Sequence, residues 1–202
     1  MKFYVLASGS KGNCSVVVSK DTVLMIDCGC SKKYMQDSLK SIGYTLDDIT
    51  ALLLTHAHID HSGLIPLLYK NGFRGQIFAT KATCELCSIM LRDSAHIQEF
   101  EAEWQNRKAK RAGEPLHVPV YTMADAEQAL TQFQSYPYGQ CIELFEGIRL
   151  TFLDAGHLLG SSSICITVEE NGESRTLLFS GDLGNSDRPL VRDPQPAVNA
   201  DY

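Results

Sequence analysis

The chain contains 202 residues, 44% of them hydrophobic and 21% charged, which is an ordinary balance for a globular protein with a substantial core. The formal net charge of −6 gives no broad positive field for nucleic acid, although bound cations would reverse the field locally. The sequence shows no export signal and no apolar run that could span a membrane. With seven irregularly spaced cysteines, we expect reduced thiols and a cytoplasmic protein.

Three strands are predicted at the start of the chain, at residues 3–6, 15–18 and 23–26, with glycine-rich or polar turns between them. The third strand ends in Asp27, directly before a glycine turn. A carboxylate in this position can orient metal ligands from behind, but it can equally form a turn or cap a helix. An amphipathic helix is predicted next, over residues 31–42.

A dense group of metal-capable side chains follows the apolar segment 51–54, namely His56, His58, Asp60 and His61. His56 and His58 point the same way in an extended segment and can bind one ion, while Asp60 and His61 lie past the turn and can bind a second. Asp60 is also a candidate catalytic residue. The alternative is a surface loop that is merely rich in histidine, and the strand–turn–helix context argues against it.

A helical insertion is predicted for residues 92–140, after a strand at 76–79 and a helix at 81–91. Its first part is strongly charged, which is typical of a solvated helix face, although the basic cluster 107–111 could contact phosphates. His96 is a candidate acid or phosphate contact in catalysis, with a surface or core histidine as the alternative. A further helix is predicted towards the end of the insertion.

The rest of the chain is β-rich, and two of its predicted strands lead into His157 and Asp182, each directly after a glycine. Both residues repeat the strand-end placement of the first motif, which favours metal binding over a structural role. The side chains then suffice for two ions, with an open position for water on the first. The expected ligands are His56, His58 and His157 for one zinc, and Asp60, His61 and Asp182 for the other, with manganese also compatible.

These motifs resemble the metallo-β-lactamase fold, whose signature is His-x-His-x-Asp-His followed by a later His and a later Asp. The segments 91–96, 154–161 and 180–185 are similar to the β-CASP branch, which contains RNA- and DNA-processing nucleases. The resemblance implies an α/β protein built as a four-layer αβ/βα sandwich. Residues 8–13 look more like small exonuclease-like relatives of the fold.

The same resemblance implies that residues 1–202 are the N-terminal portion of a metallo-β-lactamase-like domain. The family would continue into a cap domain, final strands and a last metal-binding histidine, and no histidine follows His157 here. We therefore expect a domain that is incomplete at its C-terminus and lacks one ligand of the second metal.

The leading functional hypothesis is a zinc-dependent hydrolase, a nuclease that cleaves RNA, or DNA, with a metal-bound hydroxide. One alternative is a thioester or lactam hydrolase of the same fold. Another is a metal-binding but inactive fragment or scaffold module. No membrane partner is expected, and self-association is left open.

Overall fold

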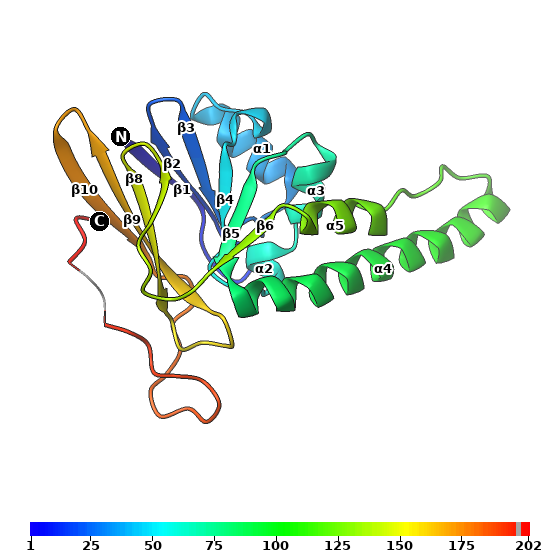
Figure 1. Ribbon diagram of the computed structural model, residues 1–202. Helices are drawn as coiled ribbons and strands as arrows, with labels where there is room; N and C mark the ends of the chain where they lie inside the picture. Colours follow the sequence, from blue (N-terminus) through cyan, green and yellow to red (C-terminus); the bar gives the residue numbers. More distant parts are fainter. Residues whose placement is uncertain (197–198) are drawn as a thin grey trace.

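The computed structural model describes residues 1–196 and 199–202 as two β-sheets packed face to face, with helices on the free side of the first sheet (Figure 1). The six strands of the first sheet lie in chain order; the first three are antiparallel and the others join in parallel. They are β1 (Lys2–Ala7), β2 (Cys14–Ser19), β3 (Thr22–Ile26), β4 (Ala51–Leu53), β5 (Gln76–Thr80) and β6 (Phe133–Tyr136).

The second sheet is wholly antiparallel and has the strand order β10-β9-β8-β7. Its strands are β7 (Ile142–Phe145), β8 (Ile148–Asp154), β9 (Ser162–Glu170) and β10 (Glu173–Phe179). The turn between β9 and β10 uses Asn171 and Gly172 with φ angles of 55° and 80°, the left-handed pair that a tight hairpin requires. Such a hairpin is what the Asn-Gly sequence predicts.

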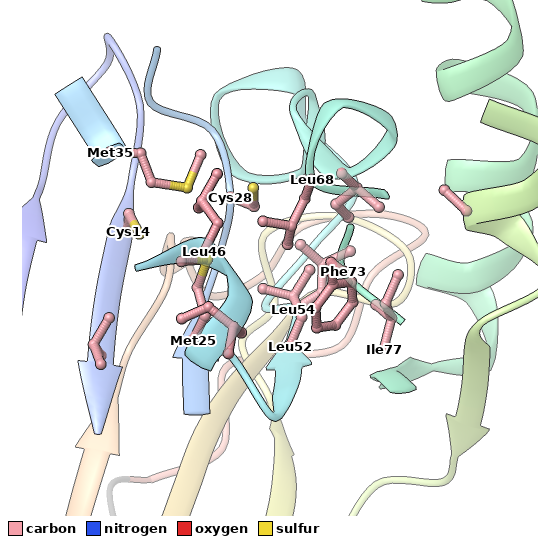
Figure 2. Packing of buried hydrophobic residues seen from close by; sticks show 14 of the residues in the cluster. Cys14, Met25, Cys28, Met35, Leu46, Leu52, Leu54, Leu68, Phe73 and Ile77 are labelled. Carbon is pink, nitrogen blue, oxygen red and sulfur yellow. The ribbon is translucent and has the colours of Figure 1, made fainter. Parts of the chain in front are cut away.

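The helices pack against the outer face of the first sheet (Figure 1). They are α1 (Lys32–Ser41), the 3-10 helix η1 (Leu46–Asp48), α2 (Ile59–Ser62), α3 (Ile65–Lys70), α4 (Lys81–Ala112) and α5 (Met123–Leu130). Met35 and Leu68 from this layer meet Met25, Leu52 and Ile77 from the sheet in one hydrophobic core (Figure 2). None of the helices in the described residues has the length and apolar character needed to cross a membrane.

A second core lies between the two sheets. Leu24 and Leu53 of the first sheet face Leu150, Phe152 and Ile166 of the second. Neighbouring residues of β3 and β4 therefore serve different cores, so both faces of these strands are buried. The helical layer and the two sheets confirm the predicted α/β sandwich, and in the described residues they form three of the four layers expected (Figure 1).

The segment 92–140 is more varied than a helical insertion. The predicted helix 81–91 does not stop at Arg92, because α4 continues as one helix of 32 residues to Ala112. Strand β6, which we did not predict, follows α5 and joins the first sheet parallel to β5. Its aromatic residues explain this placement, since the ring of Tyr136 lies 5.9 Å from that of Phe78 and is drawn into the sheet by packing.

The parallel strands place the candidate residues at one edge of the sheet. Asp27 follows β3, and its backbone N–H donates to the carbonyl of Leu53 on β4. His56 comes shortly after β4, and the backbone N–H of Ser162 at the start of β9 donates to the carbonyl of Thr55. This hydrogen bond ties the second sheet to the edge at which polar side chains collect.

Candidate metal centre

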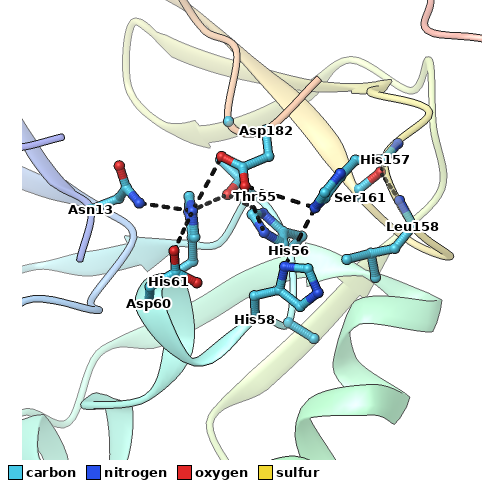
Figure 3. Close-up of polar contacts among 12 residues, drawn as sticks. Asn13, Thr55, His56, His58, Asp60, His61, His157, Leu158, Ser161 and Asp182 are labelled. Carbon is cyan, nitrogen blue, oxygen red and sulfur yellow. Dashed lines mark hydrogen bonds and ion pairs between the residues drawn. The ribbon is translucent and has the colours of Figure 1, made fainter. Parts of the chain in front are cut away.

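Four candidate ligands from three separate loops converge on one point (Figure 3). One ligand atom from each of His56, His58, His157 and Asp182 lies within 4.8 Å of the others. Nε2 of His157 is 3.4 Å from Nδ1 of His58 and 3.7 Å from Oδ2 of Asp182. The fold thus brings His157 and Asp182 to the histidine motif, as their strand-end positions predict.

A second set of side chains meets at His61. Nε2 of His61 lies 3.4 Å from Oδ1 of Asp182 and 3.9 Å from Oδ2 of Asp60. The other oxygen of Asp182, Oδ2, lies 3.8 Å from Nε2 of His56. Asp182 therefore faces both groups of side chains, one with each carboxylate oxygen.

Glycines make the close approach of these loops feasible. Gly156 and Gly181, which precede His157 and Asp182, have φ angles of 64° and 57°, a left-handed conformation that other residues rarely adopt. A side chain at Gly181 would also lie 2.8 Å from Cβ of Thr55. The two glycine turns expected from the sequence are therefore present, and one of them packs directly on the histidine loop.

Asp27 binds the ring nitrogen of His61 that faces away from the cluster. Its buried carboxylate accepts hydrogen bonds from the backbone N–H of Thr55 at 2.8 Å, from Oγ1 of Thr55 at 2.8 Å and from Nδ1 of His61 at 2.7 Å. In the neutral form of the ring, Nδ1 carries the proton of this bond and the lone pair lies on Nε2, which faces Asp60 and Asp182. This is the orienting position considered for Asp27, rather than a helix cap.

Asn13 is a contact that sequence reasoning missed. Its side-chain amide Nδ2 lies 2.8 Å from Nε2 of His61, and its Oδ1 accepts from the backbone N–H of Gly9 at 3.0 Å. The residue sits between β1 and β2, far from the motif in sequence. Only its place beside glycines in a turn marks it, and such a turn is no signal for a site.

The pKa values of the neighbouring imidazoles His56 and His61 shift in opposite directions. Burial, followed by the nearby His61, His58 and His157, lowers the pKa of His56 to about 2. Burial also opposes a charge on His61, but the hydrogen bond and charge of Asp27 outweigh it and raise the pKa of His61. His56 is thus held as a neutral imidazole, the form that can bind a metal ion.

The chemistry of the cluster fits a divalent metal ion. Nε2 of His56 is buried and has no hydrogen-bond partner in the part of the chain that the structure describes. An unpartnered buried nitrogen is unfavourable in a metal-free protein, and a bound cation would satisfy it. Imidazole nitrogens and carboxylate oxygens are also the ligand types that zinc and manganese accept.

Other residues lie outside the cluster. His96 is exposed on α4 and does not belong to the group of converging ligands, so its role in catalysis stays a prediction. All seven cysteines are free. Burial raises the pKa of the Cys87 thiol to about 12, so this thiol is not poised to react.

Comparison with known proteins agrees with this geometry. A family model described as the metallo-beta-lactamase superfamily matches residues 7–73, which include the histidine motif. This match confirms the resemblance to the metallo-β-lactamase superfamily that the histidine motif indicates. Two solved β-lactamase structures show the fold alone, at 19% sequence identity each. The subclass B3 enzyme MEM-A1 from a soil metagenome library has a TM-score of 0.56, with 87% of this chain and 58% of that chain covered. A mutant enzyme of Cronobacter sakazakii has a TM-score of 0.60, with 93% and 62% covered.

Among the curated relatives are a ribonuclease, an endoribonuclease and a transcription termination factor. Ribonuclease TTHA0252 of Thermus thermophilus is 32% identical over 94% of this chain and 39% of its own length. Transcription termination factor FttA of Cenarchaeum symbiosum is 31% identical over 85% of this chain and 25% of its own. Endoribonuclease YSH1 of Gibberella zeae is 27% identical over 95% and 22%. The chain thus spans at most about two fifths of these relatives. They bear out the resemblance to the RNA-processing branch of the superfamily.

Proposed function

We propose that this chain carries the metal-binding centre of a metal-dependent phosphodiesterase that cleaves RNA. The observation that carries the proposal is the convergence of His56, His58, His157 and Asp182 within 4.8 Å, with the buried nitrogen of His56 left unpartnered. The ribonuclease and endoribonuclease among the relatives support RNA as the substrate class. The free cysteines fit the cytoplasmic location that we propose with it.

The ligands divide between two zinc ions in this proposal, with manganese as the other metal that the ligand types suit. His56, His58 and His157 would hold the first ion, and Asp60 and His61 would hold the second, with Asp182 between them. The distances from His61 to Asp60 and Asp182 support this division. When bound, the metal would activate a water molecule and neutralise charge on the phosphate oxygens.

The chain's own residues would prepare this centre in three ways. Asp27 fixes the tautomer and the ring orientation of His61. Burial keeps His56 neutral, so that its nitrogen is free for the metal. Asn13 places its amide against Nε2 of His61 and would hold this ring in position until an ion takes its place.

The test is RNA cleavage by the natural protein that carries this chain, with zinc or manganese and after chelation. His58→Ala should reduce cleavage by more than the roughly 10–100-fold that loss of a supporting contact costs, because a direct ligand is removed. A thioester substrate assayed in parallel would show whether the same centre serves other hydrolysis. Cleavage of RNA by His58→Ala at the wild-type rate would refute the proposed centre.

A further inference from the structure

Helix α4 has apolar residues on two opposite faces. One face is buried against the body of the protein through residues such as Leu91, Ala95 and Ala102. The other carries Ile97, Phe100 and Trp104, and the last two are 63% and 53% exposed. Their spacing of three and four residues places these three side chains in one row on the helix. We call this row the α4 outer stripe.

Cations lie at the far end of the α4 outer stripe. The ammonium of Lys108 sits 3.7 Å from the centre of the Trp104 ring, and Lys110 and Arg111 follow within one turn. Arg107 is exposed too, but it pairs with Glu103 at 3.9 Å. Across residues 1–196 and 199–202, no ion pair is found for Lys108, Lys110 or Arg111. This is a local positive patch on a chain whose net charge is −6.

Three glutamates of α4 lie near the patch, and the exposed Glu101 forms no ion pair with Lys108, Lys110 or Arg111 in the described residues. Glu99 is turned towards α5, where it accepts a hydrogen bond from the backbone N–H of Met123 at 2.9 Å. Glu103 is engaged by Arg107. The far end of the outer stripe therefore combines exposed aromatic rings with cations that have no acidic partner in the described chain.

The near end of α4 is anchored to the loop that carries His157. Thr80, the residue that caps the helix, donates from Oγ1 to the carbonyl of Gly160 at 2.6 Å, in the loop that follows His157. From there α4 runs away from the sheets and projects beyond α5 (Figure 1). At a rise of 1.5 Å per residue, Trp104 lies about 36 Å along the helix from Thr80. A ligand that reaches both places must be a long one.

We propose that the α4 outer stripe binds the single-stranded RNA that leads away from the metal centre. This inference rests on the proposed function. Bases would stack on Phe100 and Trp104, and the phosphates would meet Lys108, Lys110 and Arg111. Exposed aromatic rings beside uncompensated cations are the combination that single-stranded nucleic acid recognises without sequence preference. A partner without negative charge would use the rings alone and would not require these cations.

The test is binding of a labelled single-stranded RNA of about 16 nucleotides, measured by fluorescence anisotropy without catalytic metal. The double variant Phe100→Ala/Trp104→Ala should weaken binding at least about tenfold, since each stacked base contributes about 1–3 kcal/mol. Lys108→Glu/Arg111→Glu should weaken binding and flatten its salt dependence. Lys33→Glu, a charge reversal at an exposed site on α1, should leave binding unchanged.

A second substrate separates this inference from the proposed function. Metal-dependent hydrolysis of a small phosphodiester, which cannot extend along α4, should be equal in wild type and in the stripe variants. Unchanged RNA binding by both double variants, or no binding by the wild type, would refute RNA binding by the α4 outer stripe. Neither result would bear on the proposed metal centre. A change in molecular mass by light scattering, without a change in RNA binding, would also refute RNA binding by the α4 outer stripe and mark it as a protein interface.

Discussion

The two halves of the metal cluster are built in different ways. Both ring nitrogens of His61 are held by protein atoms, Nδ1 by Asp27 and Nε2 by Asn13. His58, by contrast, is exposed, and the partner of its ring is another ligand, His157, at 3.4 Å. The fold therefore preorganises the His61 half, whereas the ring of His58 has no comparable support from residues outside the cluster. Mutations in the two halves should have correspondingly different effects.

Asp27→Ala should have the largest effect on folding. It leaves the proton of His61 Nδ1 and the backbone N–H of Thr55 buried without an acceptor. Breaking such a buried pair costs about 3–5 kcal/mol of unfolding free energy. Urea unfolding of the metal-free protein measures this directly, with Asp21→Ala, a change at an exposed aspartate, as the control.

Asp27→Asn separates packing from chemistry in the same position. The amide keeps the shape of the carboxylate but removes the charge that raises the pKa of His61. This variant should therefore have a higher unfolding free energy than Asp27→Ala. It should also bind metal, but more weakly than wild type. Equal metal affinity in Asp27→Asn and wild type would argue against preorganisation by Asp27.

Added metal should stabilise the folded protein by binding the His58 half of the cluster. An ion at one hundred times its dissociation constant adds about 2.7 kcal/mol to the unfolding free energy. We expect thermal unfolding to shift upwards with zinc and to return to its starting value after chelation. The shift should shrink in His157→Ala, which removes one ligand of the converging group. An equal shift in that variant would place the metal elsewhere.

His58→Ala should have the smallest effect on folding. Its side chain is exposed and has no buried partner to leave behind, so the metal-free variant should match wild type within about 0.5 kcal/mol. Urea unfolding in the presence of chelator checks this. A loss as large as that of Asp27→Ala would show that His58 is structural.

The sequence predicts the candidate ligands better than it predicts the residues that hold them in position. His56, His58, Asp60 and His61 are local in sequence, and strand ends predict His157. The sequence alone leaves the role of Asp27 open between orienting a ligand and forming a turn or cap, because the hydrogen bond that decides it joins residues 34 apart. Asn13 could not be predicted at all, since its contact with His61 depends on how two distant turns meet.

The fold shows the same division between local and distant causes. The hydrophobic patterns predict most strands and the helices α1 and α5 within a few residues. Strand β6 was missed because its place is decided by pairing with β5 rather than by its own four residues. The continuity of α4 was also missed, because a change from apolar to charged residues at Arg92 is no helix boundary.

The metal content of the chain, purified without chelator and measured by elemental mass spectrometry, tests the central claim most directly. We predict about two zinc or manganese ions per chain. We also predict that His61→Ala loses one of them while keeping the ion at His56, His58 and His157. A wild-type chain that carries no stoichiometric metal would contradict the claim that these loops form a metal centre.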